Sequence, residues 1–256
     1  MQAVILAAGR GTRMRPLTNS TPKPLLPLGG APMIDWIVEG LRCAGVNDIV
    51  VVTGYLGDQI ERHFREQPPA GVSVRCVDQG NPDGTGRALD ICAPWIAGRP
   101  FFMTFGDIIV PHDSYERLRQ LYQSQRADVL LAVNRVDDPC AGAAVYMESE
   151  PREDAAVSVR AIIEKPPAGS SRTNWNNAGI FILPPEIFRF TRTLRPSRRG
   201  EFELTDALAA MIAAGYDVRA WPIQGFWSDV GNPAALDAMN ALISSYYSQN
   251  QRTSTS

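Results

Sequence analysis

Apolar runs alternate with amphipathic segments from the N-terminus to about residue 135. The runs are short and rich in Val, Ile and Phe, which is typical of buried strands, and the segments between them place apolar residues at helical spacing. This alternation predicts a parallel sheet with right-handed crossovers and helices on both faces. The predicted strands cover 4–6, 49–52, 72–77, 101–105 and 128–134, and the predicted helices cover 31–44, 58–65 and 113–125.

The pattern changes between residues 139 and 183, where apolar runs follow one another without helices between them. Such a succession predicts antiparallel strands at one side of a ligand cleft. We therefore expect an α/β fold with a Rossmann-like, mostly parallel sheet flanked by helices and a small antiparallel β elaboration. The strands expected here cover 143–147, 157–163 and 178–183, and a final helix is expected over 233–244.

Length and composition indicate one globular domain. The chain has 256 residues, of which 45% are hydrophobic and 20% are charged, enough for a full core. We expect the domain to cover 1–245 and the polar residues 246–256 to form a disordered tail. The net charge of −2 favours neither nucleic acid nor an anionic membrane as partner. With no signal-peptide pattern and no apolar run of roughly 18 residues, we expect a cytoplasmic enzyme that could form a homo-oligomer.

Cysteine and histidine offer little for catalysis. The wide spacing of Cys43, Cys76, Cys92 and Cys140 favours reduced, mostly buried thiols over a metal site or disulfides. Only two histidines are present. The chain therefore offers few residues from which a Ser-His-Asp or Cys-His catalytic site could form.

A loop of small residues follows the first strand. Residues 7–11 contribute little side-chain volume apart from Arg10, so backbone N–H groups can approach a ligand closely. Arg13, Arg15 and Lys23 add further positive charge, and a bare backbone ringed by cations suits a polyphosphate. The loop lacks the Gly-Lys-Ser/Thr of a P-loop and the third Gly of the dinucleotide fingerprint, which argues against an NAD-binding oxidoreductase.

Lysine use is unusual. Of the 25 basic residues only Lys23 and Lys165 are lysines. We interpret both as sites that need a compact ammonium charge where the planar fork of arginine would not fit.

The run Leu-Ala-Ala-Gly-x-Gly-Thr-Arg-x-x-Pro-Leu-Thr, followed by Pro-Lys-Pro-Leu, resembles the signature of the sugar-1-phosphate nucleotidyltransferases. The resemblance extends through five motifs in the family's order to about Leu242. It implies a nucleotide half over about 1–135 and a sugar-binding half over about 136–245. It also implies that the nucleotide is held by Leu6, Ala8, Gly9, Gly11 and Thr12, and that Arg13, Lys23 and Lys165 are catalytic.

The same resemblance indicates which residues recognise the nucleotide base and which bind the metal ion. Gln79 and Gly84 correspond to the base-recognition segment, where Gln is more typical of enzymes that use UTP or dTTP. Asp107 follows a buried strand, and Asp229 stands in a Trp-x-Asp-x-Gly motif. Both match the family's metal-binding aspartates, and Mg²⁺ favours one or two carboxylates together with phosphate oxygens.

Further motifs resemble the part of the family's site that binds the acceptor, the sugar 1-phosphate. Glu164 and Lys165 match a Glu-Lys-Pro motif that holds the sugar hydroxyls and the sugar phosphate, and Asn177 and Gly179 match a sugar-pocket strand. Gly142 matches the family's Gly, but Ala141 stands where an aromatic residue is usual. The identity of the sugar therefore stays open.

Glu201, Glu203 and Asp206 precede or begin a helix, and we interpret them mainly as helix capping residues without a catalytic role. The predicted reaction transfers a nucleoside monophosphate from UTP or dTTP to a sugar 1-phosphate. Guanylyl or cytidylyl transfer to mannose 1-phosphate, glucose 1-phosphate or phosphocholine stays open. So does a regulatory paralogue that binds a nucleotide sugar without turnover.

Overall fold

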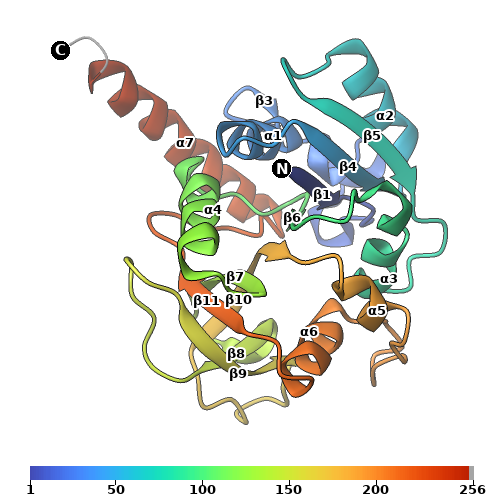
Figure 1. Ribbon diagram of the computed structural model, residues 1–256. Helices are drawn as coiled ribbons and strands as arrows, with labels where there is room; N and C mark the ends of the chain where they lie inside the picture. The colour runs from blue at the N-terminus through green and yellow to red at the C-terminus, as the bar shows by residue number, and fades with distance from the viewer. Residues whose placement is uncertain (254–256) are drawn as a thin grey trace.

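The computed structural model describes the backbone of residues 1–253 and the side chains as far as Tyr246. Its centre is a nine-stranded sheet (Figure 1). The strands of this sheet are β1 (Gln2–Leu6), β4 (Asp48–Thr53), β5 (Ser73–Asp78), β6 (Phe101–Phe105), β7 (Val129–Arg135), β8 (Ala143–Met147), β9 (Val157–Glu164), β10 (Trp175–Leu183) and β11 (Val218–Pro222), and a separate small sheet pairs β2 (Pro27–Leu28) with β3 (Ala31–Pro32).

The first four large strands form the parallel sheet that the alternating pattern predicted. They lie in the order β5-β4-β1-β6, and every neighbouring pair is parallel. Leu6 lies opposite Val52 on one side and Phe105 on the other, so these three strands end at the same edge. Ligands of such sheets bind at the carboxyl ends of the strands.

The predicted antiparallel strands belong to the same sheet as the parallel ones. The sheet continues as β6-β10-β7-β11-β9-β8, and β10 lies antiparallel between β6 and β7. The sheet is therefore mixed, and both predicted halves share it. Residues 178–183 are buried on both faces, as a central strand requires, but their apolar pattern does not reveal which strands flank them.

Helices cover both faces of the sheet. One core lies beneath α1, α2, α4 and α7, and the other lies beneath α3, α5 and α6. The bounds are α1 (Met33–Cys43), α2 (Gly57–Glu66), α3 (Thr85–Asp90), α4 (Asp113–Gln125), α5 (Ile187–Thr191), α6 (Leu204–Ala213) and α7 (Pro233–Thr253).

The last helix is longer than predicted. Figure 1 shows α7 extending away from the sheet, and it continues to Thr253 through most of the segment expected to be disordered. Residues 245–253 contain neither Gly nor Pro, so no helix-breaking residue follows Ser244. The rest of that prediction, residues 254–256, lies outside the described residues. Among the residues described, no helix combines the length and apolarity that a membrane span requires.

Candidate functional site

A cavity of about 380 Å³ opens at the carboxyl ends of β1 and β6. This volume lies in the usual range of small-molecule sites. Ten of the residues predicted from the sequence line it: Leu6, Ala8, Gly9, Gly11, Thr12, Arg13, Lys23, Gln79, Gly84 and Asp107.

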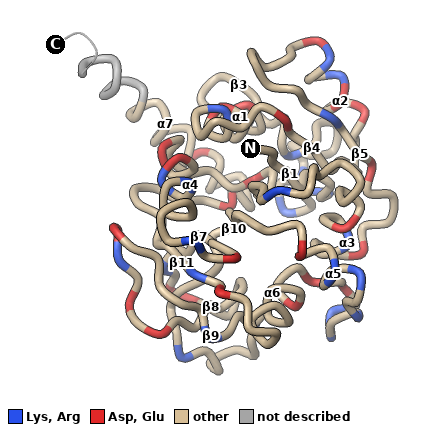
Figure 2. The backbone as a smooth tube through the Cα atoms, in the orientation of Figure 1, with Lys and Arg blue, Asp and Glu red and all other residues tan. Residues whose placement is uncertain are grey.

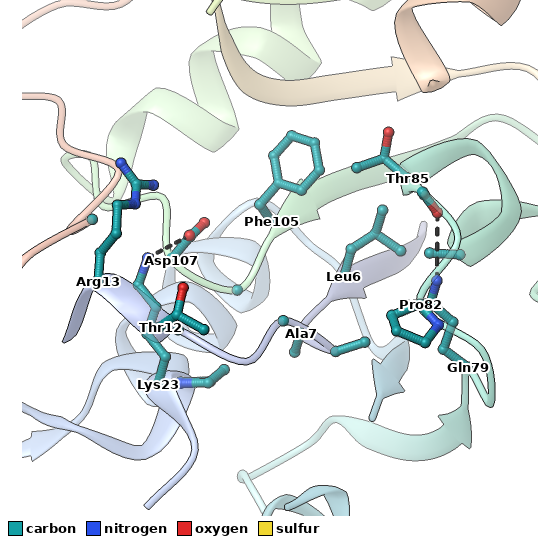
Figure 3. Close-up of a pocket in the computed structure, with 18 of the residues that line it drawn as sticks. Leu6, Ala7, Thr12, Arg13, Lys23, Gln79, Pro82, Thr85, Phe105 and Asp107 are labelled. Atoms are coloured by element: carbon teal, nitrogen blue, oxygen red, sulfur yellow. Dashed lines mark hydrogen bonds and ion pairs between the residues drawn. The ribbon is translucent and has the colours of Figure 1, made fainter. Parts of the chain in front are cut away.

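The two ends of the cavity differ in chemistry (Figure 3). Arg13, Lys23 and Asp107 lie at one end, and Gln79, Pro82 and Thr85 lie at the other. Between them Leu6, Ala7 and Phe105 form an apolar stretch. The cavity can therefore hold a molecule that is charged at one end and hydrogen-bonding at the other.

The glycine loop is folded against Lys23. Gly11 has a positive φ of 58°, and a Cβ atom there would lie 3.1 Å from Thr18 and 3.2 Å from the Lys23 side chain. The Thr18 hydroxyl donates to the Gly11 carbonyl at 2.8 Å. Glycine is needed at this position because both the backbone conformation and the close packing disfavour a side chain.

Lys23 is the centre of the charged end. Its side chain is 10% exposed, and its ammonium donates to Asp107 Oδ2 at 2.6 Å and to the backbone carbonyl of Asp229 at 3.1 Å. One buried ammonium thus joins three segments that lie far apart in the sequence. The two predicted metal ligands are brought to the same place by it.

Asp229 lies next to the cavity. A Cβ atom on the lining residue Gly231 would be 3.2 Å from both Asp229 carboxylate oxygens and 3.4 Å from an Arg13 nitrogen. The segment is held by Trp227, whose indole donates to the Ala178 carbonyl at 2.8 Å. Trp227 is partly buried and packs against the core, so this bond fixes the segment that carries Asp229.

Gln79 and Gly84 form the other end of the cavity. The backbone N–H of Gln79 donates to the Thr53 carbonyl at 2.8 Å, and its side-chain amide is 3.4 Å from the Gly84 carbonyl. Gly84 has φ 125° and ψ 168°, a conformation that is essentially confined to glycine. A Cβ atom there would lie 2.5 Å from the backbone nitrogen and oxygen of Phe202.

The predicted acceptor residues lie outside the lining of this cavity, on the neighbouring strands. Gly142 accepts a hydrogen bond from the backbone N–H of Lys165 at 3.0 Å, so the two predicted sites are adjacent. A Cβ atom on Gly142 would be 2.5 Å from the Asn176 amide nitrogen. Lys165 is exposed and has a positive φ of 39°.

Asn177 and Gly179 connect β10 to the cavity wall. The side-chain oxygen Oδ1 of Asn177 accepts a hydrogen bond from the Gly179 N–H at 2.9 Å. Gly179 has φ 81°, and a Cβ atom there would be 2.8 Å from Phe105 and 2.9 Å from Ile108. The missing side chain lets β10 pack closely against Phe105, which lines the cavity.

The carboxylate of Glu164 has two partners that the sequence analysis did not identify. Thr205 Oγ1 donates to Oε2 at 3.1 Å, and Arg199 Nη1 lies 3.4 Å from Oε1. Arg199 belongs to a run of exposed arginines after α5, where Figure 2 shows basic residues gathered. Its guanidinium also pairs with two further carboxylates, Glu201 at 3.3 Å and Glu203 at 3.2 Å.

The interpretation of Glu201 and Glu203 as helix caps is wrong, whereas Asp206 lies in the first turn of α6. Glu203 is the N-cap residue of α6, but its side chain makes no capping hydrogen bond. It accepts instead from Arg199 and from the Ser197 hydroxyl at 3.2 Å. Burial raises the pKa of Glu203, the nearby Glu164 charge raises it further, and Arg199 opposes the shift. Acids that precede a helix are commonly caps, and the sequence contained no signal for their convergence on one arginine.

The cysteines are less buried than predicted, since Cys92 is buried, Cys76 and Cys140 are half-buried and Cys43 is exposed. All four are free, and burial raises the pKa of Cys76 to about 11 and that of Cys92 to about 12. Within the part of the chain that the structure describes, no cluster of three or more His, Cys, Asp and Glu residues could hold a metal ion. The pair of aspartates beside Lys23 is thus the arrangement to consider for a cation.

Known proteins resemble this chain over nearly its whole length. A family model described as nucleotidyl transferase matches residues 2–245. The glucose-1-phosphate thymidylyltransferase of Streptomyces griseus is 31% identical over 95% of this chain and 66% of that protein. The chain spans about half to two thirds of the length of the curated relatives it matches.

Solved structures share the fold. A UDP-glucose pyrophosphorylase complexed with UDP-glucose is 24% identical, with a TM-score of 0.85 over 97% of this chain and 98% of that one. At that identity the similarity shows the fold alone. A UDP-glucose pyrophosphorylase from Acinetobacter baumanii is 25% identical, with a TM-score of 0.82 over 93% of this chain and 91% of that one.

Proposed function

Because the chain belongs to the nucleotidyl transferase family, we propose that it transfers a nucleoside monophosphate from a nucleoside triphosphate to a sugar 1-phosphate. The products are a nucleotide sugar and pyrophosphate. The observation that carries this proposal is the cavity with Arg13 and Lys23 at one end and Gln79 at the other. A nucleoside triphosphate has the matching polarity, with phosphates at one end and a hydrogen-bonding base at the other.

The chemistry needs positioning more than a proton transfer. An oxygen of the sugar 1-phosphate attacks the α-phosphorus, a new P–O bond forms, and the bond to the β-phosphate oxygen breaks in line. The acceptor phosphate is already ionised, so no general base is required. Charge neutralisation is the main task, and Arg13 on the departing pyrophosphate and Lys23 near the α-phosphate supply it.

Mg²⁺ fits the pair formed by Asp107 and Asp229. The Asp107 carboxylate already faces a cation, the Lys23 ammonium at 2.6 Å, and the Asp229 carboxylate borders the same end of the cavity through Gly231. Two carboxylates with phosphate oxygens are a donor set that Mg²⁺ favours. When bound, the ion would neutralise phosphate charge. In this chain Lys23 would keep the two aspartates oriented.

The base would be read by Gln79 and Gly84, and we favour UTP or dTTP. The hydrogen bond of the Gln79 amide to the Gly84 carbonyl orients the side chain, so that its oxygen can accept from a base N–H. Two of the relatives are named glucose-1-phosphate thymidylyltransferases, and solved structures with the same fold are named UDP-glucose pyrophosphorylases. These names support a pyrimidine nucleotide.

The acceptor would lie against β8, β9 and β10. Glu164 and Asn177 would bind sugar hydroxyls, while Lys165 would bind the phosphate. Gly142 and Gly179 allow close approach of the backbone. Their placement beside Phe105 and the turn at Lys165 supports an acceptor pocket that adjoins the nucleotide cavity.

The test is pyrophosphate release with Mg²⁺ across a matrix of nucleoside triphosphates and sugar 1-phosphates. We expect release with UTP or dTTP and one sugar 1-phosphate. Release only with GTP or CTP would keep the reaction but overturn the role of Gln79 in base choice. No release from any pair, with nucleotide-sugar binding retained, would identify a regulatory protein and overturn the proposed function.

A further inference from the structure

The residues that lead into α6, 201–205, contact the nucleotide side of the cleft through their backbone. We call this segment the strap. Phe202 donates its N–H to the Asp83 carbonyl at 2.8 Å and accepts from the Gly86 N–H at 2.8 Å. The N–H of Leu204 donates to the hydroxyl of Thr85 at 3.0 Å. Three hydrogen bonds thus tie the strap to the segment that follows Gln79.

The strap has little freedom to move on that side. Gly84 packs so closely that a Cβ atom would lie 2.5 Å from the Phe202 backbone, and the Arg87 guanidinium lies 4.5 Å above the centre of the Phe202 ring. A close backbone contact and a cation–π contact both restrict Phe202. The position of Thr205, three residues further on, is therefore set from the nucleotide side.

On its other side the strap holds Glu164. Thr205 is 5% exposed, and its hydroxyl donates to Glu164 Oε2 at 3.1 Å. The Glu164 side chain is 20% exposed, so it is only partly shielded from solvent. A carboxylate offers about four acceptor positions, and those not used by Thr205 and Arg199 can bind a ligand.

Helix formation does not account for the Thr205 hydroxyl. Glu203, not Thr205, is the N-cap residue of α6. The hydroxyl points instead to a carboxylate that is 41 residues earlier in the chain. A buried hydroxyl that donates to a partly accessible carboxylate orients that carboxylate.

We propose that Thr205 is a positioning residue that holds the Glu164 carboxylate in the orientation that binds the acceptor sugar. The strap is held in place by the segment that follows Gln79, and this contact fixes where Thr205 lies. The nucleotide side and the acceptor side of the cleft are therefore connected through the strap. The proposal rests on the proposed function, because the contact of Glu164 with the sugar belongs to it.

A double-mutant cycle tests the role. Thr205→Val removes the hydroxyl while keeping the shape, and Glu164→Ala removes its partner. At saturating nucleotide we expect Thr205→Val to lower kcat/KM for the sugar 1-phosphate about tenfold through KM. The KM for the nucleotide should stay within about twofold. In the Glu164→Ala background the same substitution should have no further effect, and Thr205→Ser should restore the wild-type value.

Thr191→Val is the matched control. Thr191 is also a buried threonine that donates to a carboxylate, Asp90 Oδ1 at 2.8 Å, but it lies on α5 away from Glu164. Equal effects of both Thr→Val changes would mean a structural role only and would overturn the proposal. So would independent, multiplicative effects of Thr205→Val and Glu164→Ala in an active wild-type enzyme. A wild-type enzyme that releases no pyrophosphate would instead overturn the proposed function, and the role of Thr205 with it.

Discussion

The ammonium of Lys23 lies 2.6 Å from Asp107 Oδ2, although 84 residues separate the two in the chain. The same ammonium donates to the Asp229 carbonyl at 3.1 Å. A single lysine therefore connects the segment after the glycine loop with both aspartates of the proposed metal pair. Because Lys23 contacts both aspartates, we expect the loss of any one of these three side chains to change the function of the other two.

Lys23→Ala should lower kcat about 100-fold or more, because removal of a preorganised charge at the reacting phosphates has an effect of this order. The free energy of unfolding should change only modestly, since Asp107 is one-third exposed and water can hydrate its carboxylate. Lys23→Arg should not restore turnover, because a planar guanidinium does not replace a compact ammonium between Asp107 and the Asp229 carbonyl. Steady-state kinetics and thermal melts measure both effects. Arg42→Ala, which removes an exposed cation paired with Glu39, is the control. Wild-type kcat in Lys23→Ala would contradict the mechanism.

Asp107→Asn should raise the Mg²⁺ concentration for half-maximal activity about tenfold or more, because an amide is a weaker ligand for Mg²⁺ than a carboxylate. Direct titration of the protein with Mn²⁺ in the presence of nucleotide should show the same loss. Asp58→Asn, at a position whose side chain is 70% exposed, controls for the change in net charge. An unchanged metal requirement would remove Asp107 from the metal site.

Gly84→Ala should reduce the free energy of unfolding by about 3 kcal/mol, because a Cβ atom meets the Phe202 backbone in a conformation that favours glycine. Gly30→Ala is a matched control, since Gly30 also has a positive φ, 92°, but no atom within 4 Å of the added carbon. Gly30→Ala should reduce the free energy of unfolding by about 1 kcal/mol. Urea unfolding of both variants gives the comparison. Equal losses would show that the contact with Phe202 does not restrict Gly84.

Glu203 should make the wild-type protein less stable as the pH rises. Burial and the charge of Glu164 raise its pKa in the folded state above the ordinary value of 4.5. The folded protein then holds this proton to higher pH than the unfolded chain does, so stability decreases as the pH rises from about 4.5 through the folded-state pKa. Relative to Glu203→Gln, the wild type should lose free energy of unfolding over this range.

Urea unfolding at a series of pH values measures that difference. Glu148→Gln, at an exposed carboxylate, controls for the loss of one negative charge. A wild-type minus Glu203→Gln difference that does not depend on pH would contradict the raised pKa of Glu203.

The predictions that held concern residues close together in the chain. The run 101–105 and the segment 113–125 have the predicted bounds in β6 and α4. The residues predicted around the glycine loop line the cavity. Helical or strand spacing and glycine placement are local properties, so they can be recognised in the sequence.

The predictions that were wrong concern contacts between residues far apart in the chain, or the end of a helix that no helix-breaking residue marks. The tail was expected to be disordered from residue 246, but α7 continues to Thr253 because no residue ends it. Glu203 was interpreted as a cap, but it binds Arg199. The antiparallel strands were expected as a small elaboration on the sugar side of the cleft; β8 and β9 do lie together at one end of the sheet, but β10 lies in its centre.

The sequence by itself determined the α/β class, the order of the early strands and helices, and the residues around Gly11 and Gln79 that line the cavity. Tertiary structure alone decided that β10 enters between β6 and β7, and that Lys23 meets Asp107. It also decided that Thr205 reaches Glu164. The physical reason is that spacing along a chain encodes local backbone conformation, whereas contacts between distant residues depend on which strands pair and which faces pack.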